Sequence, residues 1–117
     1  MLRVKRVYLP SDSDDGFRVL SDRLWPRGLS KEKAKIDLWA KDVAPTNELR
    51  TWYGHLPERW TEFRHKYLAE LEHNRETVDE LVQQLKGKKK VTLLFGAKDE
   101  EHNQAVVLHD YLASRLK

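Results

Sequence analysis

The chain has 117 residues, which is enough for one hydrophobic core and too few for two, so we expect a single domain over residues 1–117. Charged residues make up 35% of the sequence, but 22 Lys and Arg against 19 Asp and Glu leave a net charge of only +3. A dedicated nucleic-acid module usually has a larger basic excess. The absence of cysteine excludes a disulfide scaffold, a thiolate nucleophile and a cysteine-ligated metal.

Hydropathy and motif content bear on where the protein is located and on whether it binds a metal or a cofactor. The first residues lack the apolar run of a signal peptide, and no segment approaches the ~20 apolar residues of a membrane span. We therefore expect a cytoplasmic protein that does not bind membranes. The five histidines lack metal-ligand spacing, and the phosphate-loop, dinucleotide and nucleophile-elbow motifs are absent, so we expect neither a metal nor a cofactor.

The first part of the chain predicts two strands. Residues 2–9 are β-branched and aromatic, and Pro10 begins a turn-forming run that ends at Gly16. A second strand follows over residues 17–23. Because only about seven residues join the two strands, and a parallel crossover needs a dozen or more, we expect the strands to pair antiparallel.

The middle of the chain predicts helices. Apolar residues recur at three- and four-residue intervals over residues 56–71, and residues 46–53 form a shorter helix. The same spacing continues over residues 77–85, where a capping box begins at Thr77 and Gly87 follows the last turn.

The last third of the chain predicts a strand and a helix. Residues 91–95 are nearly continuously apolar, which is typical of a strand buried on both faces, and residues 101–116 carry one apolar helical face. A long helical segment separates the strand at 17–23 from this strand, so the two are most simply parallel neighbours. The sequence therefore predicts an α/β fold, with a small mixed or parallel sheet of about three to four strands covered by helices.

A candidate binding site follows the strand at residues 17–23. In open α/β sheets, ligands bind outside the carboxyl ends of parallel strands. The loop at that end carries Asp22, Arg23 and Arg27. Because the guanidinium group suits bidentate recognition of phosphate or carboxylate, this loop predicts an anion site. The alternative is a structural ion pair between Asp22 and an arginine.

The loop after residues 91–95 should open on the same side and contribute Lys98, His102 and Asn103. We expect Lys98, Asn103 and Arg50 to bind the anion together with the arginines of the first loop. Asp22 or His102 is then available for proton transfer. The alternative for His102 is a solvent-exposed residue at the start of a helix.

Two other functions remain open. Residues 23–66 carry ten Lys and Arg against six Asp and Glu, together with all four tryptophans, and such a mixture can stack bases and hold phosphates. Nucleic acid is therefore an alternative partner. An interaction protein without catalysis is a third reading, for which exposed Trp39 or Trp52 would be the sign. The sequence indicates no oligomeric state.

Several blocks also carry a family resemblance. The blocks are G-F-R-V-L at residues 16–20, D-R-L-W-P-R-G at residues 22–28, and T-L-L-F at residues 92–95. Over residues 5–112 the chain resembles the YeaO-like branch of domain-of-unknown-function family 488, which has no assigned activity.

The broader family implies two motifs at the same loops. One is Asp-x-Arg-x-x-Pro, which Asp22, Arg23 and Pro26 resemble with a different arginine spacing. The other is Cys-His-Arg, at whose position this chain has His102, Asn103 and Gln104. Because the cysteine is missing, thiol chemistry does not carry over to this chain.

Overall fold

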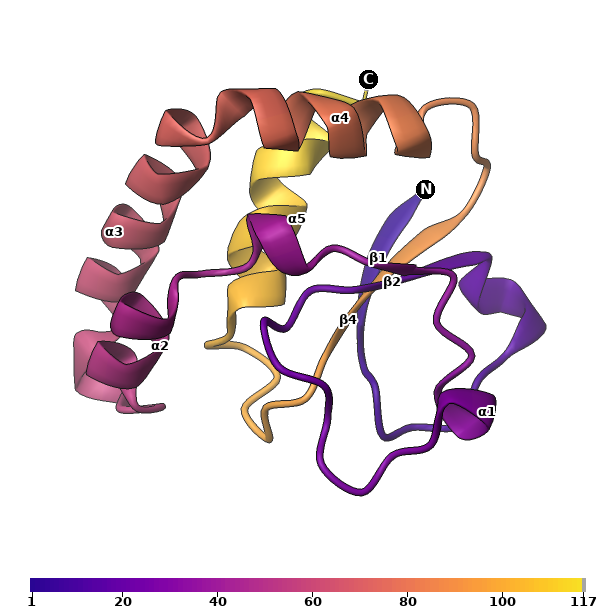
Figure 1. The fold of residues 1–117 in the computed structure, drawn as a ribbon, viewed down its shortest axis with the longest axis horizontal. Coiled ribbons are helices and arrows are strands. Elements are labelled where there is room, and N and C mark those ends of the chain that lie inside the picture. The colour runs from indigo at the N-terminus through magenta and orange to yellow at the C-terminus, as the bar shows by residue number, and fades with distance from the viewer. Residues whose placement is uncertain (117) are drawn as a thin grey trace.

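The computed structural model describes residues 1–116, and these form one α/β domain around a four-stranded parallel sheet (Figure 1). In chain order the elements are β1 (Leu2–Arg6), β2 (Phe17–Leu20), α1 (Lys31–Ala34), β3 (Leu38–Trp39), α2 (Asn47–Tyr53), α3 (Trp60–His73), α4 (Arg75–Leu85), β4 (Val91–Phe95) and α5 (Gln104–Ala113). Short 3-10 turns lie at Ser13–Asp15, Lys41–Val43 and Pro57–Arg59. Within residues 1–116, no helix is long and apolar enough to cross a membrane.

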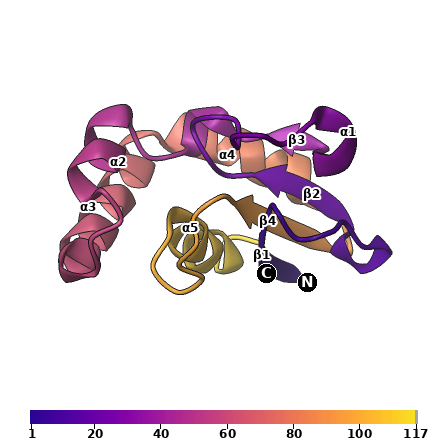
Figure 2. The same ribbon diagram turned by 90° about the horizontal axis from the view of Figure 1, so that it is seen from below.

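The strand order is β1-β4-β2-β3, and every neighbouring pair is parallel (Figure 2). The predicted parallel pairing of residues 17–23 with residues 91–95 is confirmed by the β2–β4 pair. The predicted antiparallel hairpin of the first two strands is wrong, because β4 lies between β1 and β2 and is parallel to both. The crossover from β1 to β2 contains no α-helix. It has to return along the strand, roughly 15 Å, and move sideways by two strand spacings, about 10 Å, and residues 7–16 can span both distances when extended.

A buried carboxylate holds this short crossover in place. Asp12 and Asp15 form a capping box on the 3-10 turn, and Thr92 Oγ1 of β4 donates to the Asp15 carbonyl oxygen at 2.7 Å. The Asp15 side chain is 1% exposed and accepts from Lys5 Nζ at 3.0 Å and from Arg3 at 3.1 Å. The turn is therefore fixed to both β1 and β4.

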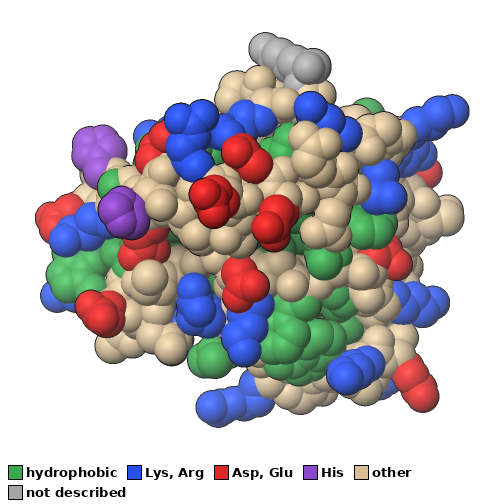
Figure 3. All heavy atoms as spheres, turned by 45° about the horizontal axis from the view of Figure 1, so that its top comes forward, with side chains coloured by type: hydrophobic (Ala, Val, Ile, Leu, Met, Phe, Trp, Pro, Cys, Tyr) green, Lys and Arg blue, Asp and Glu red, His purple; other side chains and the backbone are tan. Residues whose placement is uncertain are grey.

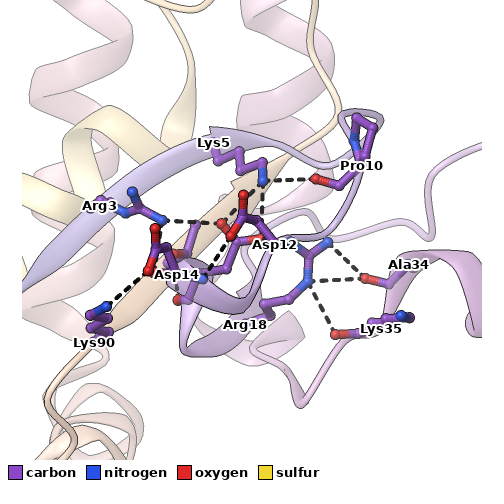
Figure 4. Close-up of polar contacts among 11 residues, drawn as sticks. Arg3, Lys5, Pro10, Asp12, Asp14, Arg18, Ala34, Lys35 and Lys90 are labelled. Carbon is purple, nitrogen blue, oxygen red and sulfur yellow. Dashed lines mark hydrogen bonds and ion pairs between the residues drawn. The ribbon is translucent and has the colours of Figure 1, made fainter.

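Arg18 connects the same cluster to α1 (Figure 4). Its guanidinium group is nearly buried, forms an ion pair with Asp15, and donates to the carbonyl oxygens of Ala34 at 2.8 Å and Lys35 at 3.2 Å. Each of the three guanidinium nitrogens of this buried cation thus donates to an oxygen, which reduces the penalty of burying the charge.

Strand β4 is buried on both faces, as the apolar run at residues 91–95 predicts. All five residues of β4 are buried. Val91, Leu93 and Phe95 belong to the large core that includes α3, α4 and α5, whereas Leu94 packs with Val7 in a small second core. Figure 1 shows α3 and α5 running side by side, with α4 across their upper ends.

The helices agree with the sequence analysis in position and differ at their ends. Thr46 caps α2 by accepting from Leu49 N at 3.2 Å, which matches the predicted helix at residues 46–53. The predicted capping box at Thr77 is wrong, because α4 already begins at Arg75. Helix α5 begins later than predicted, since the Asn103 side chain provides its N-cap.

Candidate functional site

A cavity of about 240 Å³ lies at the carboxyl edge of the sheet, between the loop after β2, the loop after β4 and the end of α2. The two loops therefore open on the same side, as the parallel arrangement predicts. Six charged, imidazole or amide side chains line the cavity: Asp22, Arg23, Arg50, His55, Asn103 and Gln104. Four of the predicted ligand-binding or catalytic residues, Asp22, Arg23, Arg50 and Asn103, are among them.

Asp22 sits in this pocket with both carboxylate oxygens engaged. Oδ2 accepts from the backbone N–H of Gly96 at 2.9 Å, and Oδ1 accepts from Nε2 of Gln104. The backbone carbonyl of Asp22 also accepts from Trp39 Nε1 at 2.7 Å. The residue therefore joins the ends of β2 and β4 to the first turn of α5.

Burial raises the pKa of the Asp22 carboxyl from 3.8 to about 6, against the opposing effects of Gly96 N–H, Gln104 and the positive charge of Arg50. Within residues 1–116, Asp22 forms no ion pair. The alternative expectation of an ion pair between Asp22 and an arginine of its own loop is therefore wrong. A carboxyl group with a raised pKa that lines a pocket is a common feature of functional sites.

Gly96 allows the carboxylate of Asp22 to approach the backbone. A Cβ atom at this position would lie 2.8 Å from Oδ2 of Asp22, which is closer than real Cβ contacts. The short G-A sequence after β4 is thus needed for the hydrogen bond from Gly96 to Asp22, and not only for ending the strand.

The Arg23 guanidinium group forms hydrogen bonds with the protein backbone. Its Nε donates to the carbonyl oxygen of Pro45 at 2.7 Å, and its Nη2 donates to that of Ala44 at 3.1 Å. These bonds fix the segment before α2 to the loop after β2. Arg23 therefore lines the pocket with a guanidinium group of which two nitrogens already donate to backbone oxygens.

Arg50 is more available than Arg23 for binding a ligand. It extends from α2 into the same pocket, and in the described part of the chain its side chain makes neither a hydrogen bond nor an ion pair. Its backbone N–H and carbonyl oxygen are satisfied within the helix, by Thr46 and Gly54. The Arg50 guanidinium group is thus the cation of the pocket that is best placed to receive an anion.

Three predicted residues lie outside the pocket. Arg27 and Lys98 are exposed and do not line it. The His102 ring is turned away, with Nδ1 at 2.9 Å from the Asp99 carboxylate and the ring edge against Trp60. The structure therefore does not bring these three side chains together with Asp22.

Three polar pocket residues, Tyr53, His55 and Gln104, were given no functional role from the sequence. Tyr53 is buried at the end of α2 and donates to the His102 carbonyl oxygen at 2.9 Å, and His55 follows it with a positive φ of 58°. Gln104 holds Asp22 from the first turn of α5. The rule about strand ends draws attention to loops after strands, so it does not find residues at the end of a helix. Gly54, which ends α2, is the sequence feature that could have drawn attention to Tyr53 and His55 on either side of it.

Of the four tryptophans of residues 23–66, Trp25, Trp52 and Trp60 are partly buried and Trp39 is exposed. Trp25 packs perpendicular to Trp39 at 5.4 Å, and Arg59 and Lys66 lie over the ring of Trp52 at 5.2 and 5.1 Å. On the face in Figure 3, basic and acidic side chains are interspersed. Nucleic-acid binding stays a prediction, which steep weakening of RNA or DNA binding with salt would test.

Trp39 is 37% exposed and Trp52 is half-buried. Trp39 lies on the edge strand β3 and is one of the exposed large apolar side chains of the described chain. The reading of an interaction protein therefore also stays a prediction.

Comparison with known proteins places the whole chain in one family. The model of DUF488-N3i, described as the inactive DUF488-N3 subclade, matches residues 1–117. The chain is 44% identical over 114 residues to the uncharacterized protein Rv3073c of Mycobacterium tuberculosis, covering 97% of this chain and 95% of that protein. It is 42% identical over 114 residues to the uncharacterized protein YeaO of Escherichia coli, covering 97% of each.

No solved structure matches the chain. The resemblance of the D-R-L-W-P-R-G block to the YeaO-like branch is confirmed by these full-length matches. The chain belongs to the DUF488-N3i family.

Proposed function

We propose that this protein binds a small anionic ligand, with a carboxylate or phosphate group, in the pocket between the loops after β2 and β4. The observation that carries the proposal is the Arg50 guanidinium group, which faces a cavity of about 240 Å³ and has no partner within residues 1–116. A guanidinium group forms strong, bidentate bonds with carboxylate and phosphate oxygens.

Binding without turnover is the better reading of the site. Asp22 can exchange a proton near neutral pH, but His102, the second predicted acid–base group, is engaged with Asp99 outside the pocket. The description of the matching subclade as inactive also favours binding over catalysis.

An NMR titration tests the proposal. Benzoate and phenyl phosphate are added separately to ¹⁵N-labelled protein, and the amide of Gly96, the side-chain amide of Gln104 and Nε of Arg50 are followed. We expect saturable shifts at these groups with at least one ligand, at dissociation constants of about 1 mM or below.

Two variants locate the contact. Arg50→Met should weaken binding by about tenfold to a hundredfold, because a hydrogen bond to a charged group contributes about 1.5–3 kcal/mol. Arg75→Met removes an exposed arginine of α4 and is the matched control, which should bind as the unmodified protein does. Absence of saturable shifts with both ligands, or equal binding by Arg50→Met, would overturn the proposal.

A further inference from the structure

We infer that the ligand of this pocket is a zwitterion with the chemistry of an α-amino acid, whose carboxylate binds Arg50 and whose ammonium group binds Asp22. The inference rests on the proposed function, since it assigns a ligand class to the same pocket. It begins from two opposite charges that line one cavity, yet within residues 1–116 do not form an ion pair with each other.

Asp22 retains capacity to accept hydrogen bonds. Gly96 N–H occupies one position on Oδ2 and Gln104 Nε2 occupies one on Oδ1. An ionised carboxylate has about four acceptor positions, so about two remain. An ammonium group supplies three donors and a positive charge, and it would hold the buried carboxyl in its ionised form.

The pocket is poorly suited to a phosphate group. Three amides around the start of α5 are already occupied, because Asn103 Oδ1 accepts from Val106 N at 3.2 Å and Asp99 Oδ1 accepts from the amides of Glu101 and His102 at 2.9 and 3.0 Å. A phosphate dianion would have to lie near one guanidinium group and beside the like charge of Asp22, which disfavours it. A carboxylate carries less charge and fits a single guanidinium fork.

The size and walls of the pocket fit an amino acid with an apolar side chain. Its volume of about 240 Å³ lies below the ~300–1,000 Å³ typical of sites for larger ligands and cofactors. Trp25, Tyr53 and Phe63 supply apolar and aromatic surface in the same cavity. An aromatic or large aliphatic side chain would pack against these rings.

Calorimetric titrations with three matched ligands at neutral pH test the inference. L-Phenylalanine has both charges, 3-phenylpropionate lacks the ammonium group, and 2-phenylethylamine lacks the carboxylate. We expect the protein to bind phenylalanine at least about tenfold more tightly than either analogue, since each lost charged contact removes about 1.5–3 kcal/mol. Phenyl phosphate should bind more weakly than phenylalanine.

Variants separate this inference from the proposed function. Asp22→Asn should abolish the preference for phenylalanine over 3-phenylpropionate while retaining the binding of 3-phenylpropionate, whereas Arg50→Met should lose both. If the unmodified protein binds 3-phenylpropionate or phenyl phosphate as tightly as phenylalanine, with dependence on Arg50, the zwitterion inference fails and anion binding stands. If no carboxylate or phosphate binds in an Arg50-dependent way, both fail.

A second measurement needs no substitution at Asp22. The preference of the unmodified protein for phenylalanine should fall as the pH is lowered through about 6, where the Asp22 carboxyl gains a proton. The other charged or titratable side chains that line the cavity with Asp22 are Arg23 of its own loop, Arg50 and Tyr53 of α2, His55 beyond α2, and Tyr8. Measuring Asp22→Asn at the same pH values isolates the effect of His55, and an unchanged preference across this range in the unmodified protein would overturn the inference.

Discussion

Replacing Asp22 by asparagine should make the protein more stable at neutral pH. The buried carboxyl has a pKa of about 6 in the folded protein and 3.8 as the reference value of an unperturbed side chain. An uncharged amide of the same shape keeps the hydrogen bond from Gly96, and rotation of the Gln104 amide restores the second. The substitution therefore removes the cost of burying a charge and preserves the contacts.

The size and sign of the effect follow from proton linkage. A pKa rise from 3.8 to about 6 corresponds to about 3 kcal/mol. Between these values the folded state holds the proton more tightly than the unfolded state, so the free energy of unfolding falls as the pH rises. This loss of unfolding free energy is absent well below pH 3.8 and complete above about pH 6. The Asp22→Asn variant has no carboxyl group at this position and does not show the loss.

Urea unfolding of both proteins across this pH range measures the effect. The difference in unfolding free energy, variant minus unmodified protein, should grow by about 2.4 kcal/mol from about pH 4 to pH 7. Asp42→Asn removes an exposed carboxylate and is the control for the substitution itself. A difference that stays constant across the range, or that changes in the opposite direction, would refute the assignment of a raised pKa to Asp22.

Three further substitutions test other parts of the structure. Gly96→Ala places a Cβ atom 2.8 Å from the Asp22 carboxylate, so we expect a loss of about 1–3 kcal/mol in chemical unfolding and weaker ligand binding. Asp15→Asn leaves a buried guanidinium group without its counter-charge and should cost about 3–5 kcal/mol, measured by the same method. Arg23→Met should cost about 1.5–3 kcal/mol through two lost bonds to carbonyl oxygens, whereas the exposed Arg27→Ala should change stability by less than about 0.5 kcal/mol; equal losses would contradict the different roles given to the two arginines.

Local sequence patterns predicted the helices and the central strand, because these depend on spacing and capping that lie close together in the chain. The run at residues 91–95 is buried on both faces, and the helix after Thr46 begins where its cap predicts. Strand β3 was missed since Leu38–Trp39 is too short for a periodic pattern. The pairing of β1 was missed because it depends on Asp15, whose partners lie on several elements.

The candidate site was only partly predictable for a similar reason. The strand-end rule places Asp22 and Asn103 at one sheet edge, and the structure places both in one pocket. Which arginine remains available is decided by tertiary hydrogen bonds: Arg23 is committed to carbonyl oxygens of the chain before α2, and Arg50 is not. Nothing in the local sequence distinguishes these two side chains.

Two buried aspartates show how the fold separates a structural carboxylate from a functional candidate. For Asp15, burial acts to raise the pKa, but hydrogen bonds from Asp12 N–H, Lys5 and Arg18 and the charge of Lys5 lower it overall, so the ionised form stabilises the fold. For Asp22, burial dominates, and the ionised form opposes folding at neutral pH. A residue that lowers stability, that faces a pocket and that requires a glycine beside it is better explained by binding than by architecture. An ammonium group of a ligand would offset the cost that the fold leaves uncompensated, which is the physical reason for expecting a positively charged group in the ligand beside Asp22.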